Sequence, residues 1–137
     1  MKVQSYLNFD GRCEEALDFY RKGLDAEVTM LLRFKDNPEA GSSGGVAPGT
    51  ENKVMHSSFR IGDTEVMASD GYCQGKGTFQ GVSLALSVAS DAEAKRRFDA
   101  LGDGGKVQQP LIKTFFSSSF GVVADRFGVS WMVVVES

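Results

Sequence analysis

The stretch DRFGVSWM, residues 125–132, decides the fold, because its last six residues align with a hairpin segment from the first half of the chain. It predicts a tight turn from Asp125 to Gly128 that leads into the final strand. The earlier segment is GDTEVM, residues 62–67, which predicts the turn and second arm of a β-hairpin. Moving it forward by 65 positions places it on FGVSWM and aligns Met67 with Met132.

The helices of the chain repeat as well. The first is expected from Cys13, with apolar residues at helical spacing. The second follows Ser90, a good N-cap, and Glu93 completes a capping box. In both halves the order of elements is strand, helix and then three strands. A shift of 78 positions aligns Ser5 with Ser83, Glu15 with Glu93, Ala16 with Ala94, and Tyr20 with Phe98.

This order predicts an α+β fold of two βαβββ modules, about residues 1–71 and 82–137, in a single domain of residues 1–137. Each module exposes one apolar sheet face. We expect the modules to pair about a pseudo-twofold axis, which covers both faces and forms a curved mixed sheet around a cleft. Residues 35–53 are polar and glycine-rich, and a loop of this length is usually a functional lid or a disordered segment, so we expect a mobile loop.

Composition and charge restrict the classes of partner. The 137 residues are 42% hydrophobic, which suits one globular domain. With a net charge of -3 and scattered lysines and arginines, the chain is not expected to bind nucleic acid. No apolar run has the length of a membrane span or a signal peptide, so we expect a cytoplasmic protein that does not bind membranes. Cys13 and Cys73 are expected to be reduced thiols.

Three polar residues are candidates for chemistry. His56 is the only histidine and lies on a strand with Ser58 and Arg60 on the same face, so it could act as a general base or bind a ligand. The alternative is a hydrogen-bonded strand histidine. Asp70 could be a catalytic carboxylate in the cleft or a turn aspartate that binds its own backbone. For Asp125 the structural interpretation is favoured.

Methionines and aromatic residues supply a possible ligand surface. Sulfur atoms and aromatic rings contact flat apolar ligands well, although core packing must account for most aromatic residues. Cys73 has no evident activating histidine, so we expect no nucleophilic role for it. The residues that we expect to line the cleft are Ser5, Met67, Ser83, Phe116, Phe120, Trp131 and Met132.

Three segments together resemble the PhnB-like branch of the vicinal oxygen chelate superfamily, often labelled 3-demethylubiquinone 3-methyltransferase-like. They are YLNFDGRCEEALDFYRKGL, MHSSFRIGDTEVMASD and FGVVADRFGVSWMV, and the resemblance spans essentially the whole chain. The superfamily includes glyoxalases, bleomycin-resistance proteins and extradiol dioxygenases. The resemblance implies paired βαβββ modules, a cleft and a homodimer. In metal-using members, four side chains, typically His, Gln or Glu, hold a divalent ion.

Placing that pattern on the chain puts Ser5, Met67, Ser83 and Met132 at the four ligand positions. None of them is a usual ligand for a hard divalent cation, so we expect no metal and no other cofactor. Glu65 lies two residues before Met67, and Glu136 lies four residues after Met132. Both remain alternative ligands.

We therefore expect a PhnB-like protein that binds a small apolar or aromatic molecule without a metal. The alternative is a metal-dependent or His56-based lyase, isomerase or dioxygenase-type enzyme. A third hypothesis is a chain that functions chiefly through dimerisation or a protein partner. True methyltransferase activity is not expected, because the glycines of GSSGGVAPG, residues 41–49, lie in a long loop rather than after the first strand of a doubly wound sheet.

Overall fold

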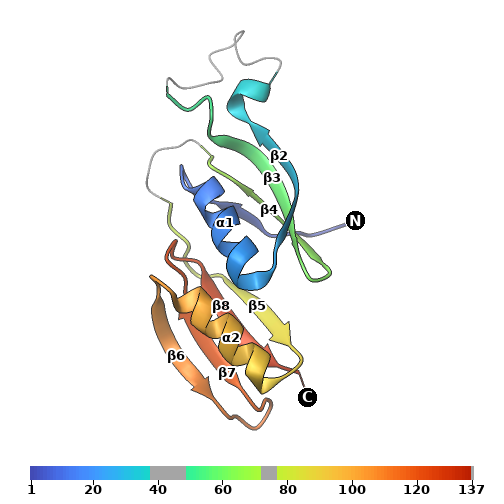
Figure 1. Cartoon of the computed structure of the whole chain (residues 1–137), viewed down its shortest axis with the longest axis vertical. Coiled ribbons are helices and arrows are strands. Elements are labelled where there is room, and N and C mark those ends of the chain that lie inside the picture. The colour runs from blue at the N-terminus through green and yellow to red at the C-terminus, as the bar shows by residue number, and fades with distance from the viewer. Residues whose placement is uncertain (38–48, 72–76, 137) are drawn as a thin grey trace. The chain divides into compact units, whose positions relative to one another are not determined.

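A computed structural model describes residues 1–37, 49–71 and 77–136 of the chain (Figure 1). Most of the loop expected at residues 35–53, and Cys73, lie outside the described residues. The chain divides into two compact units, Met1–Gly77 (unit 1) and Thr78–Ser137 (unit 2). No helix within the described ranges is long and apolar enough to cross a membrane.

In the described residues, each unit contains one α-helix and a four-stranded mixed sheet, as expected for two βαβββ modules. The strand order is β1-β4-β3-β2 in unit 1 and β5-β8-β7-β6 in unit 2. The first strand of each unit pairs in parallel with the last, and the other pairs are antiparallel. Unit 1 comprises β1 (Tyr6–Asn8), α1 (Cys13–Leu24), β2 (Glu27–Arg33), the short 3-10 helix η1 (Phe34–Asp36), β3 (Val54–Ile61) and β4 (Thr64–Ser69). Unit 2 comprises β5 (Ser83–Val88), α2 (Asp91–Gly102), β6 (Lys106–Ile112), β7 (Phe120–Ala124) and β8 (Ser130–Val135).

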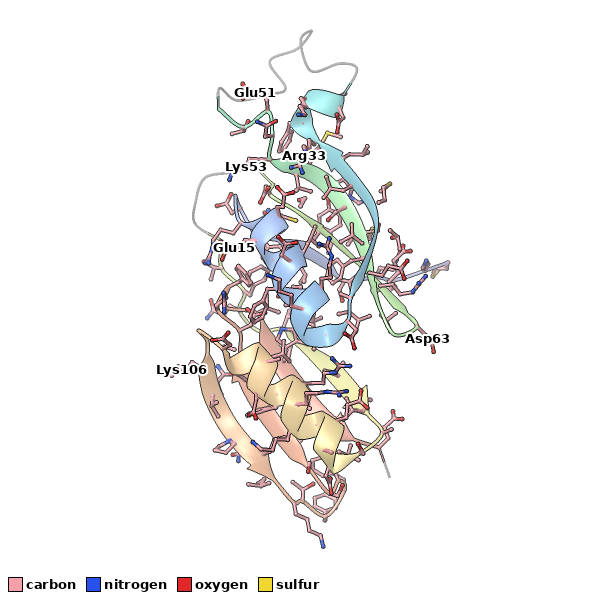
Figure 2. All side chains as sticks on the ribbon, viewed as in Figure 1. Glu15, Arg33, Glu51, Lys53, Asp63 and Lys106 are labelled. Carbon is pink, nitrogen blue, oxygen red and sulfur yellow. The ribbon has the colours of Figure 1, made fainter. Side chains whose placement is uncertain are left out.

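The core of unit 1 lies between α1 and its sheet. Tyr20 of α1 stacks on Phe59 of β3, with ring centroids 5.8 Å apart, and both side chains are fully buried. Burying an aromatic side chain of this size contributes about 1.5–3 kcal/mol. The predicted face of the helix is confirmed, because its buried residues are Cys13, Ala16, Leu17, Tyr20 and Leu24. The predicted hairpin is also confirmed, with Gly62 and Asp63 between β3 and β4 (Figure 2).

The core of unit 2 lies between α2 and β7 and β8. The Ser90 hydroxyl accepts the Glu93 N–H at 3.2 Å, which confirms the predicted N-cap. Phe98 lies so close to β7 that a Cβ atom on Gly121 would come within 2.7 Å of its ring. The predicted turn is present, because the Gly128 N–H donates to the Asp125 carbonyl at 2.9 Å and Gly128 has a positive φ of 90°.

The internal repeat differs in register between helices and first strands. The helices begin at Cys13 and Asp91, which are 78 positions apart as predicted (91 − 13). In the first strands, Tyr6 pairs with Met67 and Ala85 pairs with Met132, which gives a shift of 79 (85 − 6). The alignment of Ser5 with Ser83 is therefore wrong, because the connection from the first strand to the helix is one residue shorter in unit 2.

Candidate functional site

The sheet of unit 1 has one face that α1 does not cover, which we call the open face of unit 1. Ser57 and Phe59 contact Cys13 and Tyr20 of α1, so the alternating residues of β3 point to the other side. Three of its large side chains are exposed, namely Tyr6 (49%), Met30 (40%) and Leu32 (39%). The open face consists of Tyr6, Met30, Leu32, His56, Ser58 and Met67, with Met67 placed between Tyr6 and Ser58.

Tyr6 and His56 contact each other across this face. The Tyr6 hydroxyl lies 3.0 Å from His56 Nδ1, and the two ring centroids are 5.6 Å apart. Tyr6 belongs to β1 and His56 to β3, so the phenol side chain crosses the intervening strand β4. The sequence identified His56 as a candidate but gave no sign of this partner, because the contact depends on the order of strands in the sheet.

Two charged residues of the face form an ion pair, and a third is hydrogen-bonded to a neutral side chain. Arg60 and Glu27 form an ion pair at 2.5 Å, and Glu65 lies opposite Arg60 on β4. The Gln4 side chain also donates to the Glu65 carboxylate at 3.2 Å. Glu65, which lies on the same face as Met67, therefore has a hydrogen-bond partner in Gln4.

The open face of unit 2 is apolar at its centre. Met132 lies between Ala85 of β5 and Val122 of β7. Phe120 belongs to the same face two residues before Val122, and the exposed Phe116 contacts Phe120 edge-to-face at 5.2 Å. The structure thus brings together three residues of the predicted ligand surface, Met132, Phe120 and Phe116.

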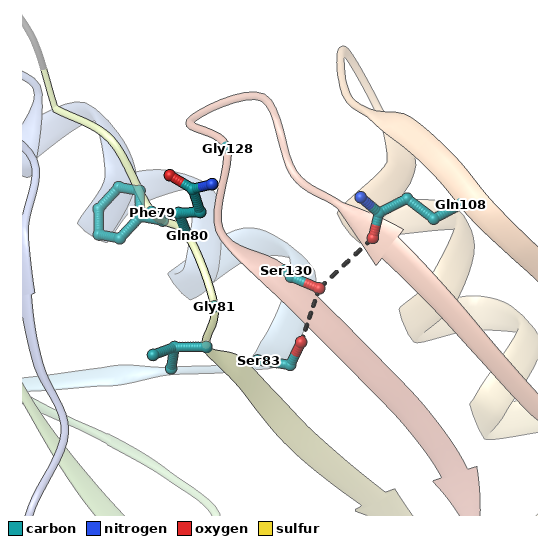
Figure 3. A pocket seen from close by; sticks show the side chains of 8 residues that line it. Phe79, Gln80, Gly81, Ser83, Gln108, Gly128 and Ser130 are labelled. Carbon is teal, nitrogen blue, oxygen red and sulfur yellow. Dashed lines mark hydrogen bonds between the residues drawn. The ribbon is translucent and has the colours of Figure 1, made fainter.

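A polar pocket of about 340 Å³ lies at one end of this face (Figure 3). The Ser83 and Ser130 hydroxyls are 2.8 Å apart, and Ser130 lies 3.5 Å from the side-chain oxygen of Gln108. The lining residues are Phe79, Gln80, Gly81, Val82, Ser83, Gln108, Gly128 and Ser130, none of which carries a charge. This arrangement can donate and accept hydrogen bonds to a neutral polar group.

Trp131 lies on the opposite face from Met132. Strand neighbours alternate, and Trp131 is buried with Val133 and Val135, whereas Met132 is only half-buried. The indole N–H donates to the Asp125 carboxylate at 2.9 Å, and the backbone N–H groups of Phe127 and Val129 bind the other carboxylate oxygen. Asp125 therefore joins the turn to the core of unit 2 through its hydrogen bonds. This is the structural role that the sequence favoured for Asp125.

Asp70 is fully buried and accepts three backbone hydrogen bonds. Its Oδ1 binds the N–H groups of Gly11 and Cys13 at 2.8 and 2.7 Å, and its Oδ2 binds the N–H of Val54 at 2.8 Å. The side chain of Arg12, the N-cap residue of α1, makes no capping hydrogen bond. Asp70 accepts hydrogen bonds from the backbone N–H groups at the start of the helix instead. Asp70 therefore has a structural role, because these bonds join the start of α1 to the start of β3.

Two ionisable groups near α1 have shifted pKa values. Burial raises the pKa of the Cys13 thiol to about 12, so this cysteine is a poor nucleophile in the folded state. The Arg33 guanidinium binds the Glu14 carboxylate through two nitrogens, at 3.1 and 2.6 Å. The hydrogen bond from Arg33 holds the pKa of Glu14 below its ordinary value. This pair joins α1 to the end of β2.

The residues at the expected metal positions do not fit a hard divalent cation. In unit 1, Met67 has Tyr6 and Ser58 beside it, and in unit 2, Met132 has Ala85 and Val122. Such ions require carboxylate, imidazole or carbonyl donors. Within residues 1–37, 49–71 and 77–136, no three His, Cys, Asp or Glu side chains are grouped so that they could hold a metal.

Comparison with known proteins identifies the family. The family model described as 3-demethylubiquinone-9 3-methyltransferase matches residues 1–134. Protein YjdN of Escherichia coli (strain K12) is 34% identical over 142 residues, which covers 98% of this chain and 95% of that protein. The PhnB protein from Bacillus cereus is 31% identical, with a TM-score of 0.81 over 98% of this chain and 99% of that one.

A more distant structure shares the fold. A glyoxalase-related enzyme from Fulvimarina pelagi has a TM-score of 0.64 and 17% identity, covering 99% of this chain and 88% of that chain. At this identity the likeness concerns the fold alone. Together, the family model, the PhnB protein and the glyoxalase fold agree with the resemblance seen in the sequence. The chain belongs to the 3-demethylubiquinone-9 3-methyltransferase family, a PhnB-like branch of the vicinal oxygen chelate superfamily.

Proposed function

We propose that this protein binds a small apolar or aromatic molecule on the open faces of its sheets, with no divalent metal at the superfamily's ligand positions. It acts by sequestering or sensing that molecule. The observation that carries the proposal is the equivalent placement of Met67 and Met132 at the centres of the two faces. A thioether contacts aromatic rings well and is a weak donor to hard cations.

The surroundings of the two methionines support this proposal. Met30, Leu32 and Tyr6 expose apolar surface on unit 1, and Phe116 and Phe120 extend it on unit 2. The uncharged pocket beside Ser83 and Ser130 adds hydrogen-bonding groups for a polar substituent. Both mixed sheets differ from the doubly wound parallel sheet of typical S-adenosylmethionine methyltransferases, so methyl transfer is not part of the proposal.

The metal part of the proposal is tested by native mass spectrometry and elemental analysis of protein purified without chelator. We expect no stoichiometric divalent ion, and a retained small molecule would appear as a discrete added mass. The same spectrum reports whether the homodimer implied by the resemblance forms. A bound ion present at one per chain would overturn the metal-free proposal.

Met132→Glu tests whether a carboxylate at position 132, one of the four expected ligand positions, is enough for the protein to bind a divalent metal. We expect only weak Mn²⁺ binding by calorimetry, because Ala85 and Val122 beside it supply no further donor. Val134→Glu, on the same face of β8, is the matched control and should behave alike. Tight binding by Met132→Glu alone would show that other ligands already converge there.

A His56-based enzyme is the second candidate, and the contact with Tyr6 favours it. A histidine held by a hydrogen bond at one ring nitrogen is a common arrangement for acid–base chemistry at the other. If the protein is a His56-based enzyme, the wild type will turn over a substrate in a screen of carbonyl and peroxide compounds, and His56→Ala will abolish that turnover. The circular dichroism spectrum of the variant should stay unchanged, because the fold is kept. Normal turnover in that variant would remove the support for this candidate.

A further inference from the structure

The contact between Tyr6 and His56 determines which ring nitrogen is available to a ligand. A neutral imidazole has one donor nitrogen and one acceptor nitrogen. The Tyr6 hydroxyl lies 3.0 Å from Nδ1. A phenol hydroxyl can donate or accept a hydrogen bond, and toward an imidazole nitrogen it is the better donor because it is more acidic than the imidazole N–H. An imidazole that accepts at Nδ1 carries its own proton at Nε2. We propose that Tyr6 fixes His56 as the Nε2–H tautomer, and that this N–H binds a carbonyl oxygen of the ligand.

The surroundings of His56 define the class of ligand. Within the ranges 1–37, 49–71 and 77–136, the only hydrogen-bond partner of the ring is Tyr6, so Nε2 is free to bind. Leu32 lies beside His56, and Met30 and Met67 lie on either side of Ser58. The side chains around His56 are mainly apolar, and the Ser58 hydroxyl is nearly buried. This face therefore suits a molecule with an apolar body and one oxygen acceptor.

The charges on this face favour a neutral acceptor over an anion. Arg60 is the nearest cation along β3 on this face, and it is held by Glu27, with Glu65 opposite. Among the described residues of this face, no unpaired cation is therefore placed to compensate a carboxylate. The class of ligand that fits is a neutral aromatic or aliphatic carbonyl compound.

This inference rests on the proposed function and narrows it. Because Nδ1 accepts from Tyr6 and Nε2 already carries a proton, the ring donates a hydrogen bond at the open face rather than removing a proton there. His56 is then a binding residue that polarises a carbonyl, and Tyr6 is a positioning residue that acts through it.

The tautomer can be measured without any ligand. Long-range ¹H–¹⁵N spectra at pH 8 give the ¹⁵N chemical shifts of the two ring nitrogens of His56. Since His56 is the only histidine, its signals need not be distinguished from those of another residue. We expect a single Nε2–H tautomer in the wild type and a mixture, or exchange between forms, in Tyr6→Phe. A proton on Nδ1 in the wild-type protein would overturn the inference.

The ligand is tested with two probes of matched shape, acetophenone and isopropylbenzene. Labelled methionine methyl groups of Met30 and Met67 report occupation of the open face, and the His56 ring protons report the hydrogen bond. We expect both probes to move the methyl signals and only acetophenone to move the ring signals. Acetophenone should bind about two- to tenfold more tightly, the range of one net hydrogen bond.

Variants of His56 separate the hydrogen bond from simple contact. In His56→Leu, both probes should bind equally, whereas His56→Gln, which keeps a donor, should retain part of the preference. An unchanged preference for acetophenone in His56→Leu would overturn this inference alone. If neither probe moves any methionine methyl signal, the proposed function fails, and the carbonyl part of the inference fails with it.

Discussion

Asp70→Ala is expected to destabilise unit 1 by about 3–5 kcal/mol. The substitution leaves the N–H groups of Gly11, Cys13 and Val54 without their acceptor, and each unsatisfied buried donor costs about 1–3 kcal/mol. The loss lowers the urea midpoint measured by far-UV circular dichroism. The start of α1 should also lose protection from hydrogen exchange, because Asp70 takes the place of its missing cap.

Two variants show whether this loss is specific to the buried carboxylate. Asp18→Ala removes an exposed carboxylate on α1 that pairs with Arg21, and it should change stability by less than about 0.5 kcal/mol. Asp70→Asn keeps the shape and one oxygen, so it should fall between the two. If Asp70→Ala folds with wild-type stability, the structural role is wrong and a catalytic role for Asp70 becomes the better explanation.

Trp131→Ala is expected to destabilise unit 2 by about 3–5 kcal/mol, the usual cost of truncating a buried large aromatic residue. Trp131 is 2% exposed, and its indole N–H satisfies Asp125. Circular dichroism in urea gives the value, since the variant has no other tryptophan.

Trp131→Phe separates packing from hydrogen bonding. It keeps most of the buried ring but removes the indole N–H that donates to Asp125 Oδ2, so we expect a loss of about 1–2 kcal/mol. Binding of acetophenone beside His56 in unit 1, measured at low temperature where the variant is folded, should be unchanged, because Trp131 is buried in the core of unit 2. A stable Trp131→Phe variant that no longer binds would place this residue in the ligand site after all.

Much of the fold could be predicted from local patterns. Helical spacing identified the buried face of α1, including Ala16 and Tyr20, because the period of a helix depends on the chain alone. The turn at Asp125 and the N-cap at Ser90 were also predictable, because their hydrogen bonds join residues a few positions apart. The order of elements was enough to predict two similar modules.

The candidate site was less predictable, because it depends on strand order and register. Tyr6 meets His56 only because β1 lies beside β4, which brings residues 50 positions apart into contact. Likewise, one residue fewer before α2 places Ala85 beside Met132, rather than the Leu84 that a shift of 78 from Tyr6 would give. The position of Trp131 could have been predicted, since neighbours on a strand point to opposite faces and Met132 was already assigned to the ligand face.

The close approach of Phe98 to Gly121 also constrains how this family can diverge. A methyl group at position 121 would overlap the ring and come within 3.0 Å of the Gln109 carbonyl. A relative with a larger residue there must carry a smaller one at position 98 or shift its helix outward. The two positions should therefore covary.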